Sequence, residues 1–444
     1  MGPEAIAAFS IIALFAMILI GFHVALSLAF TSFVALFAIT GKFRVAAGVL
    51  EKTAFSAVMD YVYAVIPLFV LMGLLTTAAG ATKELFRAAE RGTRRLKGGV
   101  GISTVMANAV FAAITGVSVA SAAVFSKIAV PEMQRLNYER PFSLGIVGAS
   151  SLLGMLIPPS VLMIVYGVIT EQSIGRLFAA GIVPGLIVAF FLSAAIWLMV
   201  YLRPSRGGLM ANGKNPLDDT ATSANFVQTL WRPWPVYLLI LGVLGGLYRG
   251  FFTPTEAGAI GAFGTALILL MRGKFSMPLG KSILLDTGKS TASIFLLLIT
   301  ALMYSRMLTL SGLPSGLTTW VTTLDLSTGT VVLLFIVILL LLGMILDSIS
   351  ILLLTMPIML PVMLALGQDP IWFGIIAIVT IEIGLLTPPF GMVIFAMKAV
   401  LPDDVKIEEI YLGTAPFLLV LLLVLAVLVW APGLTLWAPN LLFN

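Results

Sequence analysis

Two residue types that carry much of protein chemistry are almost missing from this 444-residue chain. It has no cysteine and a single histidine, His23. The lack of cysteine excludes disulfides, iron–sulfur clusters and thiol catalysis. We interpret the lone histidine, which follows an apolar block, as a polar boundary residue rather than a metal ligand.

Charged residues are scarce as well. They make up 10% of the chain and hydrophobic residues 60%, whereas a soluble domain carries about 25% charged residues. The apolar residues form long blocks, such as Ala5–Ile20, Val331–Met344 and Phe417–Trp430, and such blocks are typical of membrane spans. The composition therefore predicts an all-α, multi-pass membrane protein. Its net charge of +5 requires no nucleic acid as a partner.

Two similar segments lie 230 residues apart. Both "GMLIPPSVLMIVYG" (154–167) and "GLLTPPFGMVIFAM" (384–397) place adjacent prolines in an apolar stretch. Adjacent prolines remove two backbone donors and disfavour helical geometry before them, so each segment predicts a helix broken within the membrane. The same offset aligns two further pairs: Pro131 with Pro361, and Ser118 with Ser348. Paired interruptions predict an internal duplication and often mark a transporter's binding site.

The distribution of Lys and Arg predicts the topology. Segments 98–131 and 326–364 have small, polar centres and short arms, so each is either one crossing or a re-entrant hairpin. If both are hairpins, most Lys and Arg residues fall on one side, as expected for cytoplasmic loops. These predicted loops are 83–97, 127–140, 203–232, 272–289 and 398–406. Two full crossings would remove this asymmetry, and we therefore predict ten spans plus two hairpins, with both termini outside.

An odd number of crossings in each half makes the two halves inverted relative to each other. The predicted halves are 1–203 and 233–444, joined by a cytoplasmic linker at 204–232. Because no basic segment precedes the first apolar block, we expect a first span rather than a cleaved signal peptide. Two of the shorter predicted spans are 23–40 and 234–250.

The interrupted helices are the candidate binding site. Backbone groups freed at membrane depth are tolerated where they line a cavity, since lipid cannot satisfy them. Half-helix N-termini then favour anions, and exposed carbonyl groups bind cations. One predicted sodium shell comprises Thr115, Gly116, Ser118, Ser121, Gly154 and Pro158. The other comprises Gly343, Asp347, Ser348, Ser350, Gly384, Thr387 and Pro388. The predicted substrate ligands are Ser118, Pro159, Ser160, Ser348, Pro389 and Arg306. The alternative is that these glycines and prolines merely kink the helices.

Charged residues within membrane segments are functional candidates by default. Asp347 lies at the centre of the second hairpin, and Glu382 lies just before the second break. Glu256 fits helix capping as well as a functional role. Arg306 could face an anionic substrate, pair with a carboxylate or extend to the membrane interface. Asp60, beside two tyrosines, is typical of that interface.

Three segments together resemble a known family. "GMLIPPSVLMIVYGVITEQSIGRLFAAGIVPG" (154–185), "FFTPTEAGAIGAFG" (251–264) and "GLLTPPFGMVIFAMK" (384–398) are similar to the large membrane subunit of tripartite ATP-independent periplasmic (TRAP) transporters. The resemblance covers essentially the whole chain. It implies an elevator-type, sodium-driven importer of the ion transporter superfamily, in the bacterial inner membrane with both termini periplasmic.

The resemblance also implies partners and a division of labour. A periplasmic binding protein would deliver the substrate, and a separate, small four-helix membrane subunit would complete the assembly. The substrate would be an organic acid, such as a C4-dicarboxylate, sialic acid or another sugar acid, and sodium would be the coupling ion, without a cofactor. Scaffold spans are then expected at 1–80 and 233–311, and mobile transport elements at 98–172 and 326–400.

Three rival functions are weighed against this prediction. A stand-alone sodium/dicarboxylate symporter of the same superfamily would have similar repeats. An intramembrane enzyme would need Ser118 as a nucleophile or Asp60 and Asp347 as an aspartyl pair. However, the only histidine lies at a span end, no G-x-S-x-G motif occurs, and neither aspartate has a Gly-x-Gly-Asp setting, so we expect no enzyme. Similar broken segments in both halves favour alternating access over a passive channel or a scaffold subunit.

Overall fold

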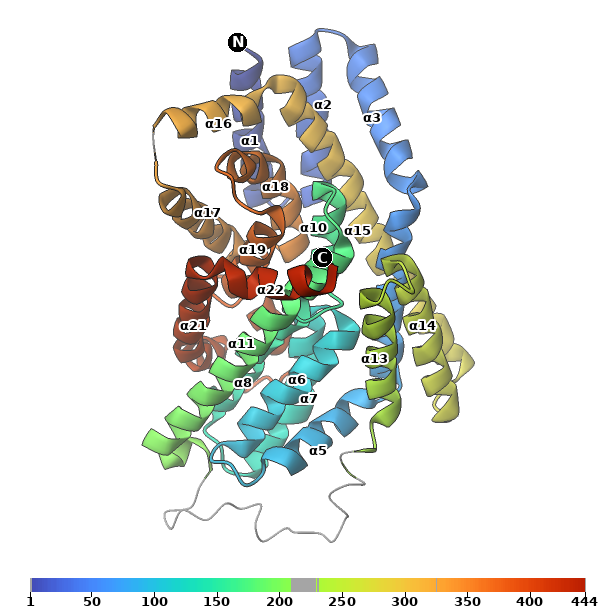
Figure 1. Ribbon diagram of the computed structural model, residues 1–444, viewed down its shortest axis with the longest axis vertical. Helices are drawn as coiled ribbons and strands as arrows, with labels where there is room; N and C mark the ends of the chain where they lie inside the picture. Colours follow the sequence, from blue (N-terminus) through green and yellow to red (C-terminus); the bar gives the residue numbers. More distant parts are fainter. Residues whose placement is uncertain (1, 209–228, 230, 325, 444) are drawn as a thin grey trace.

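The computed structural model describes residues 2–208, 229, 231–324 and 326–443. In this part of the chain the regular secondary structure is helical, apart from one isolated bridge between Tyr138 and Gly207 (Figure 1). Most of the predicted linker at 204–232 lies outside the described residues. The fold class predicted from composition, an all-α protein with many apolar helices, is confirmed.

The first half runs from scaffold-like helices into a hairpin and a broken helix. Its elements are α1 (Pro3–Ile20), α2 (Val24–Thr40), α3 (Phe43–Met59), the 3₁₀ turn η1 (Tyr61–Ala64), α4 (Val65–Ala78), α5 (Ala81–Thr93), α6 (Gly99–Thr115), α7 (Ser118–Arg135), α8 (Arg140–Ser151), α9 (Leu153–Leu156), α10 (Val161–Thr170), α11 (Ile174–Leu202) and η2 (Pro204–Arg206). The helices α6 and α7 form the first hairpin, and the first break separates α9 from α10.

The second half repeats this order. Its helices are α13 (Trp234–Tyr248), α14 (Pro254–Met271), α15 (Met277–Ser311), α16 (Leu313–Thr323), α17 (Thr328–Gly343), α18 (Ser348–Ala365), α19 (Pro370–Gly384), α20 (Met392–Lys398), α21 (Ile407–Trp430) and α22 (Pro432–Phe443). A shift of 230 residues places α6 and α7 on α17 and α18, α8 on α19, and the α3–α4 unit on α15.

The two halves pack reciprocally. Helix α4 packs against α14, and the exchanged pair, α2 and α15, also packs together. The same holds for α8 with α21 and α11 with α19, and for α7 with α20 and α10 with α18. Reciprocal contacts of this kind are what a pseudo-twofold axis generates. In Figure 1 the equivalent helices α5 and α16 lie at opposite ends of the molecule.

Several segments predicted as loops are helical. Helix α5 occupies most of 83–97, α7 continues to Arg135 within 127–140, and α15 begins at Met277 within 272–289. Residues 43–59 form α3, which packs against α2 and α15. Charges keep these segments out of the apolar membrane interior, but they do not prevent helix formation where one face packs.

Span length is the other point at which the prediction and the structure differ. Eight helical segments of the described chain are long and apolar enough to cross a membrane, compared with the ten predicted spans. One of the eight is α18, an arm of the second predicted hairpin, and the second broken span, α19 with α20, is not among them. The predicted spans 23–40 and 234–250 form α2 and α13, which have only 17 and 15 residues. A helix perpendicular to the membrane needs about 20 residues, so length alone does not identify these two as crossings.

The core of the protein is centred on the two broken helices. In α19 every residue from Ile371 to Gly384 is buried, and 83% of an 18-residue apolar window within Arg140–Thr170, which holds α8 to α10, is buried as well. The outer helices instead expose large apolar side chains, such as Leu241 at 73% and Leu419 at 71%. An outward apolar surface around a densely packed centre fits a protein surrounded by lipid.

Candidate functional site

The tip of the first hairpin contacts the first break through backbone atoms. Gly116 adopts a left-handed conformation (φ +62°), and its carbonyl oxygen accepts a hydrogen bond of 3.2 Å from the amide of Val161. A Cβ atom at Gly116 would lie 2.6 Å from the carbonyl oxygen of Pro159, and one at Gly154 would lie 2.9 Å from the amide of Ser118. Only glycine therefore permits this approach.

The second hairpin approaches the second break in a related way. A Cβ atom at Gly384 would lie 2.7 Å from the Cα atom of Gly343. The hydroxyl of Tyr411 on α21 donates a 2.9 Å hydrogen bond to the carbonyl oxygen of Pro389. The helices stop at Leu156 and Gly384 and resume at Val161 and Met392. Both predicted breaks are thus real interruptions rather than kinks.

The two hairpin tips meet at one carboxylate, Glu382 on α19. Glu382 is only 1% exposed, and its Oε1 atom accepts a 2.7 Å hydrogen bond from the hydroxyl of Ser348, at the start of α18. The Ser118 side chain, at the start of α7, interacts with the same carboxyl group. However, neither Ser118 Oγ nor Glu382 Oε2 has a hydrogen-bond partner of ordinary geometry in the described chain. We call Ser118, Ser348 and Glu382 the tip cluster.

Most other candidate side chains in the first half already have protein partners. The hydroxyl of Ser121 donates to Asn108 Oδ1, and Asn108 Nδ2 donates to Ser150 Oγ over 2.9 Å, which ties both hairpin arms to α8. Thr115 bonds the carbonyl of Phe111 at 3.1 Å. Ser160 caps α10 by accepting from the amide of Met163, and its hydroxyl donates to the carbonyl of Met155.

Candidates in the second half are occupied in the same manner. Asp347 caps α18, because its side chain accepts from the amide of Ser350 at 3.0 Å and also from the Ser350 hydroxyl. The hydroxyl of Thr387 bonds the carbonyl of Ile383 at 2.8 Å. Fewer side-chain oxygen atoms are therefore free to bind a cation than the predicted sodium shells contain.

Charged residues outside the tip cluster have simpler roles. Glu256 and Thr253 form a complete capping box at the start of α14, as the capping alternative predicted. Asp60 caps η1 through the amide of Val62. Arg306 is exposed on α15, whereas the tip cluster is buried. The structure therefore does not bring Arg306 together with the other predicted substrate ligands.

Three members of this site were missed in the predicted ligand sets. Asn108 and Ser150 were not named at all, although Asn108 is an amide within an otherwise apolar hairpin arm. Glu382 was recognised only as an intramembrane charge and was left out of both sodium shells. The repeat could not reveal these residues, since their equivalents at the 230-residue offset are Ile338, Thr380 and Leu152.

The donor set suits a hard cation. It consists of the Ser118 hydroxyl and a carboxylate oxygen of Glu382, and oxygen ligands of this type are the ones that hard cations take. Within the described ranges, no three His, Cys, Asp or Glu side chains gather as a metal cluster would require. The orphaned atoms Ser118 Oγ and Glu382 Oε2 are buried polar groups that a small cation could satisfy.

Comparison with known families decides what kind of protein carries this site. The family described as "Tripartite ATP-independent periplasmic transporter, DctM component" matches residues 11–434. The chain belongs to this DctM family of TRAP transporters. Family membership confirms the predicted resemblance and gives a multi-pass subunit of a bacterial transporter.

Relatives of this DctM-family chain are named as permeases for several acids. It is 35% identical to the C4-dicarboxylate TRAP transporter large permease protein DctM of Pseudomonas aeruginosa, over 86% of each chain. It is 30% identical to a DctM protein of Rhodobacter capsulatus, over 97% of this chain and 98% of the relative. It is 31% identical to the sialic acid TRAP transporter large permease protein SiaM of Vibrio cholerae, over 85% and 86%.

A solved structure shares the fold at low sequence identity. The Alcanivorax borkumensis YdaH transporter, described as having an unusual topology, aligns with a TM-score of 0.62 at 15% identity, and the alignment covers 98% of both chains. At this identity the likeness concerns the fold alone.

Proposed function

We propose that this DctM-family chain carries out sodium-coupled import of an organic acid across the bacterial inner membrane by alternating access. The observation that carries the proposal is the tip cluster, in which the hairpin tips of both halves reach one buried carboxylate. A buried charge is stable only with a compensating partner. A sodium ion beside Ser118 Oγ and Glu382 Oε2 would provide that partner.

The anionic substrate is proposed to bind next to this cation. Ser118 and Ser348 are the first residues of α7 and α18, and helix N-termini favour anions because their amides carry partial positive charge. A cation that neutralises Glu382 removes a repulsive charge from the same region, so the substrate binds more readily after sodium. This order of binding would couple uptake to the sodium gradient.

Movement is proposed to occur as an elevator. The hairpins and broken helices, α6 to α10 and α17 to α20, would move together against the scaffold formed by α1 to α4 and α13 to α15. The matched interruptions and the reciprocal packing of the two halves support this division. Such motion lets one central site face each side of the membrane in turn.

Partners and substrate class are proposed from the relatives. Their names mention C4-dicarboxylate, sialic acid and, for a protein of Escherichia coli, 2,3-diketo-L-gulonate. We propose an organic acid of this range as the substrate, delivered by a periplasmic binding protein, and a small four-helix membrane subunit as the permanent partner.

Uptake by proteoliposomes tests the proposal. The chain is reconstituted with the small subunit and supplied with its binding protein loaded with a radiolabelled organic acid. We expect uptake only with an inward sodium gradient and only with the binding protein; potassium in place of sodium serves as the control. Uptake of free acid without the binding protein would instead support a stand-alone symporter. Uptake without a sodium gradient would contradict sodium coupling.

A further inference from the structure

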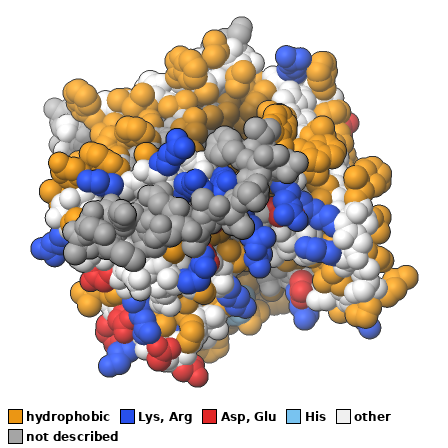
Figure 2. Space-filling model, turned by 90° about the horizontal axis from the view of Figure 1, so that it is seen from below, with side chains coloured by type: hydrophobic (Ala, Val, Ile, Leu, Met, Phe, Trp, Pro, Cys, Tyr) orange, Lys and Arg blue, Asp and Glu red, His pale blue; other side chains and the backbone are white. Residues whose placement is uncertain are grey.

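A second site lies at the basic end of the molecule, away from the tip cluster. Figure 2 shows Lys and Arg side chains gathered on this face. A cavity of about 670 Å³ opens here between α5 and the last turns of α7, within the size range of ligand pockets, roughly 300–1,000 Å³. Its lining residues are Lys83, Phe86, Arg87, Glu90, Arg91, Arg94, Ile128, Glu132, Arg135 and Thr229. We call it the basic pocket.

The charge of the basic pocket is strongly unbalanced. Five of its lining side chains are cationic and two are carboxylates; of the five cations, Arg91 and Arg94 take part in further interactions of their own. One carboxylate, Glu132, is taken by Arg135, with which it forms an ion pair. Lys83 and Arg87 form no hydrogen bond or close ion pair with any residue in the described ranges. An excess of positive charge at one concave site attracts an anion.

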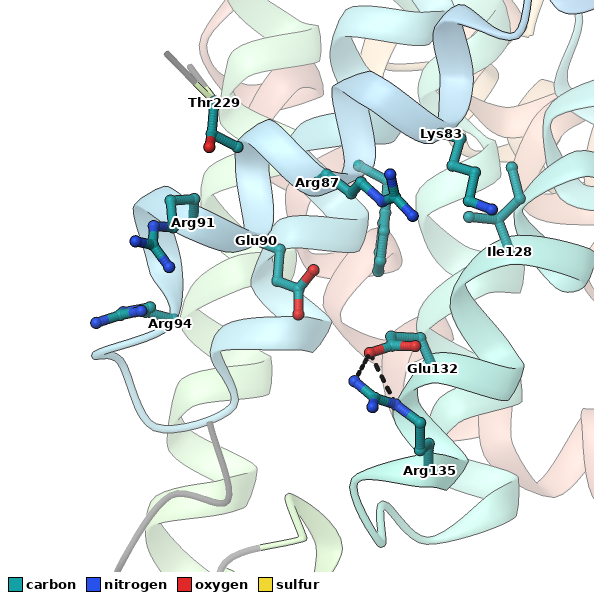
Figure 3. Close-up of a pocket in the computed structure, with 10 residues that line it drawn as sticks. Lys83, Arg87, Glu90, Arg91, Arg94, Ile128, Glu132, Arg135 and Thr229 are labelled. Atoms are coloured by element: carbon teal, nitrogen blue, oxygen red, sulfur yellow. Dashed lines mark hydrogen bonds and ion pairs between the residues drawn. The ribbon is translucent and has the colours of Figure 1, made fainter. Parts of the chain in front are cut away.

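The geometry of α5 concentrates this charge. Lys83, Arg87 and Arg91 follow one another at intervals of four residues, so they share one face of the helix, and like charges at this spacing destabilise a helix. In Figure 3 the Arg87 side chain extends toward the side of the cavity where Lys83 lies, and the Lys83 side chain ends beside Ile128. A ligand that bridges them would remove this repulsion.

The second carboxylate is poorly suited to neutralise the pocket. Glu90 faces the Glu132–Arg135 pair across the cavity (Figure 3). Burial, and then the nearby Glu132 carboxylate, raise the pKa of Glu90 above its ordinary value, against the opposing effects of Arg135, Arg87 and Arg91. Glu90 also forms no close ion pair with Lys83 or Arg87 in the described ranges, so these two cations remain open to a ligand.

The pocket also has an apolar part. Phe86 and Ile128 contribute to its wall, and Phe86 and its neighbour Leu85 on α5 are buried. Helix α5 is not among the helices that are long and apolar enough to cross a membrane. In Figure 1 it lies at one end of the bundle that those helices form. A cationic rim beside an apolar wall, at the predicted cytoplasmic surface, matches the chemistry of a phospholipid headgroup.

We propose that the basic pocket binds a phosphate group, either that of an anionic phospholipid or free phosphate, through Lys83 and Arg87. Phosphate oxygens accept hydrogen bonds from several directions, and guanidinium groups bind them in a bidentate manner. The pocket is distinct from the transport site. None of its residues belongs to the tip cluster, and Ile128 lies ten residues along α7 from Ser118, about 15 Å at the rise of an α-helix.

Ligand titration of the purified full-length chain tests this site. The thermal unfolding midpoint in detergent is followed with dioctanoyl phosphatidylglycerol, with dioctanoyl phosphatidylcholine and with inorganic phosphate. We expect saturable stabilisation by phosphatidylglycerol. K83Q/R87Q should weaken its binding roughly thirtyfold, since each cation near a lipid surface contributes about 1 kcal/mol. The matched control K281Q/K289Q removes two exposed cations from α15 and should change binding less than about twofold.

Because K83Q/R87Q would also lose binding if it misfolded, the test includes a second variant that is expected to strengthen binding. E90Q removes a negative charge from the pocket and should tighten binding severalfold. Competition by inorganic phosphate would identify the phosphate group itself as sufficient, whereas binding of phosphatidylglycerol without such competition would identify the lipid. Equal weakening in K281Q/K289Q, no response to E90Q, or equal binding of phosphatidylcholine in every variant would overturn the proposal.

Discussion

The two breaks share a sequence pattern but differ in exposure. Pro158 and Pro159 in the first break are buried, whereas Pro388 and Pro389 in the second are exposed. In both, the Pro–Pro peptide bond is cis. The first break is closed by its own hairpin tip through Gly116 and Val161. The second has a glycine contact with its hairpin only at its start, at Gly384.

The shared break pattern follows from the internal duplication, whereas the difference in exposure is a property of this conformation. The shared pattern fixes where the helices stop and which glycines permit close approach. It does not fix which break is exposed, because exposure depends on how each break packs against the rest of the protein. The polar chemistry is also unequal, since Glu382 in the second half corresponds to Leu152 in the first. One carboxylate thus serves both hairpin tips.

The largest expected effect is on sodium affinity, when the single carboxylate of the tip cluster, Glu382, is replaced. Glu382→Gln preserves the shape of the side chain but removes its charge, and losing one partner of a buried charge interaction costs about 3 kcal/mol. We expect sodium affinity in proteoliposome uptake to fall about a hundredfold. The measurement is the sodium concentration that gives half-maximal uptake.

A control for this variant is Glu256→Gln, which changes an exposed carboxylate in the capping box of α14. It should leave the sodium dependence unchanged. Similar sodium dependence in wild type, Glu382→Gln and Glu256→Gln would show that the tip cluster has a structural role only.

The second effect concerns the exposure of the two breaks. Because the chain lacks cysteine, single cysteines can be introduced without a background. Phe390 is 55% exposed, and its equivalent at the 230-residue offset, Ser160, is fully buried. In the resting protein, F390C should react with a polar maleimide about tenfold faster than S160C, since thiol reactivity follows access.

Turnover should narrow this difference if the two breaks exchange environments. With sodium, substrate and binding protein present, S160C labelling should accelerate and F390C labelling should slow. Labelling rates that stay constant under turnover would contradict alternating access at these breaks and would leave the exposure difference as a fixed property of the fold.

Local chemistry was enough to predict the two helix breaks and the turn between α6 and α7 at Gly116. Adjacent prolines cannot continue a helix, and the small residues Gly116 and Ser118 allow a tip, so these positions follow from sequence alone. The partners of the side chains do not. Ser348 and Glu382 lie 34 residues apart, and Asn108 and Ser150 lie 42 apart, so only packing of separate helices brings them together.

The positions of the charged residues led to wrong predictions of local structure. The segments around Arg87 and Lys281 were predicted as loops because they hold several charges, but both are helical. Helix formation depends on backbone propensity and on one packed face. The Lys and Arg count predicts the side of the membrane on which a segment lies, and it says little about whether that segment is helical.

The smallest expected effect is on thermal stability, and it concerns two helix starts that correspond in the repeat. Asp369, which caps α19, accepts hydrogen bonds from the amides of Ile371 at 2.7 Å and Trp372 at 3.1 Å. Its equivalent, Glu139, precedes α8 without a side-chain cap and forms only a surface ion pair with Arg206. Loss of a helix cap costs about 1 kcal/mol, whereas a surface ion pair is worth about 0–1 kcal/mol.

Asp369→Ala should therefore lower the thermal unfolding midpoint of the full-length chain by about 1–2 °C. Glu139→Ala should lower it less in the same detergent. Because both positions begin helices that lead to a break, equal shifts would mean that capping does not distinguish the two halves. The unequal polar chemistry would then be confined to the tip cluster and the hairpin network around Asn108.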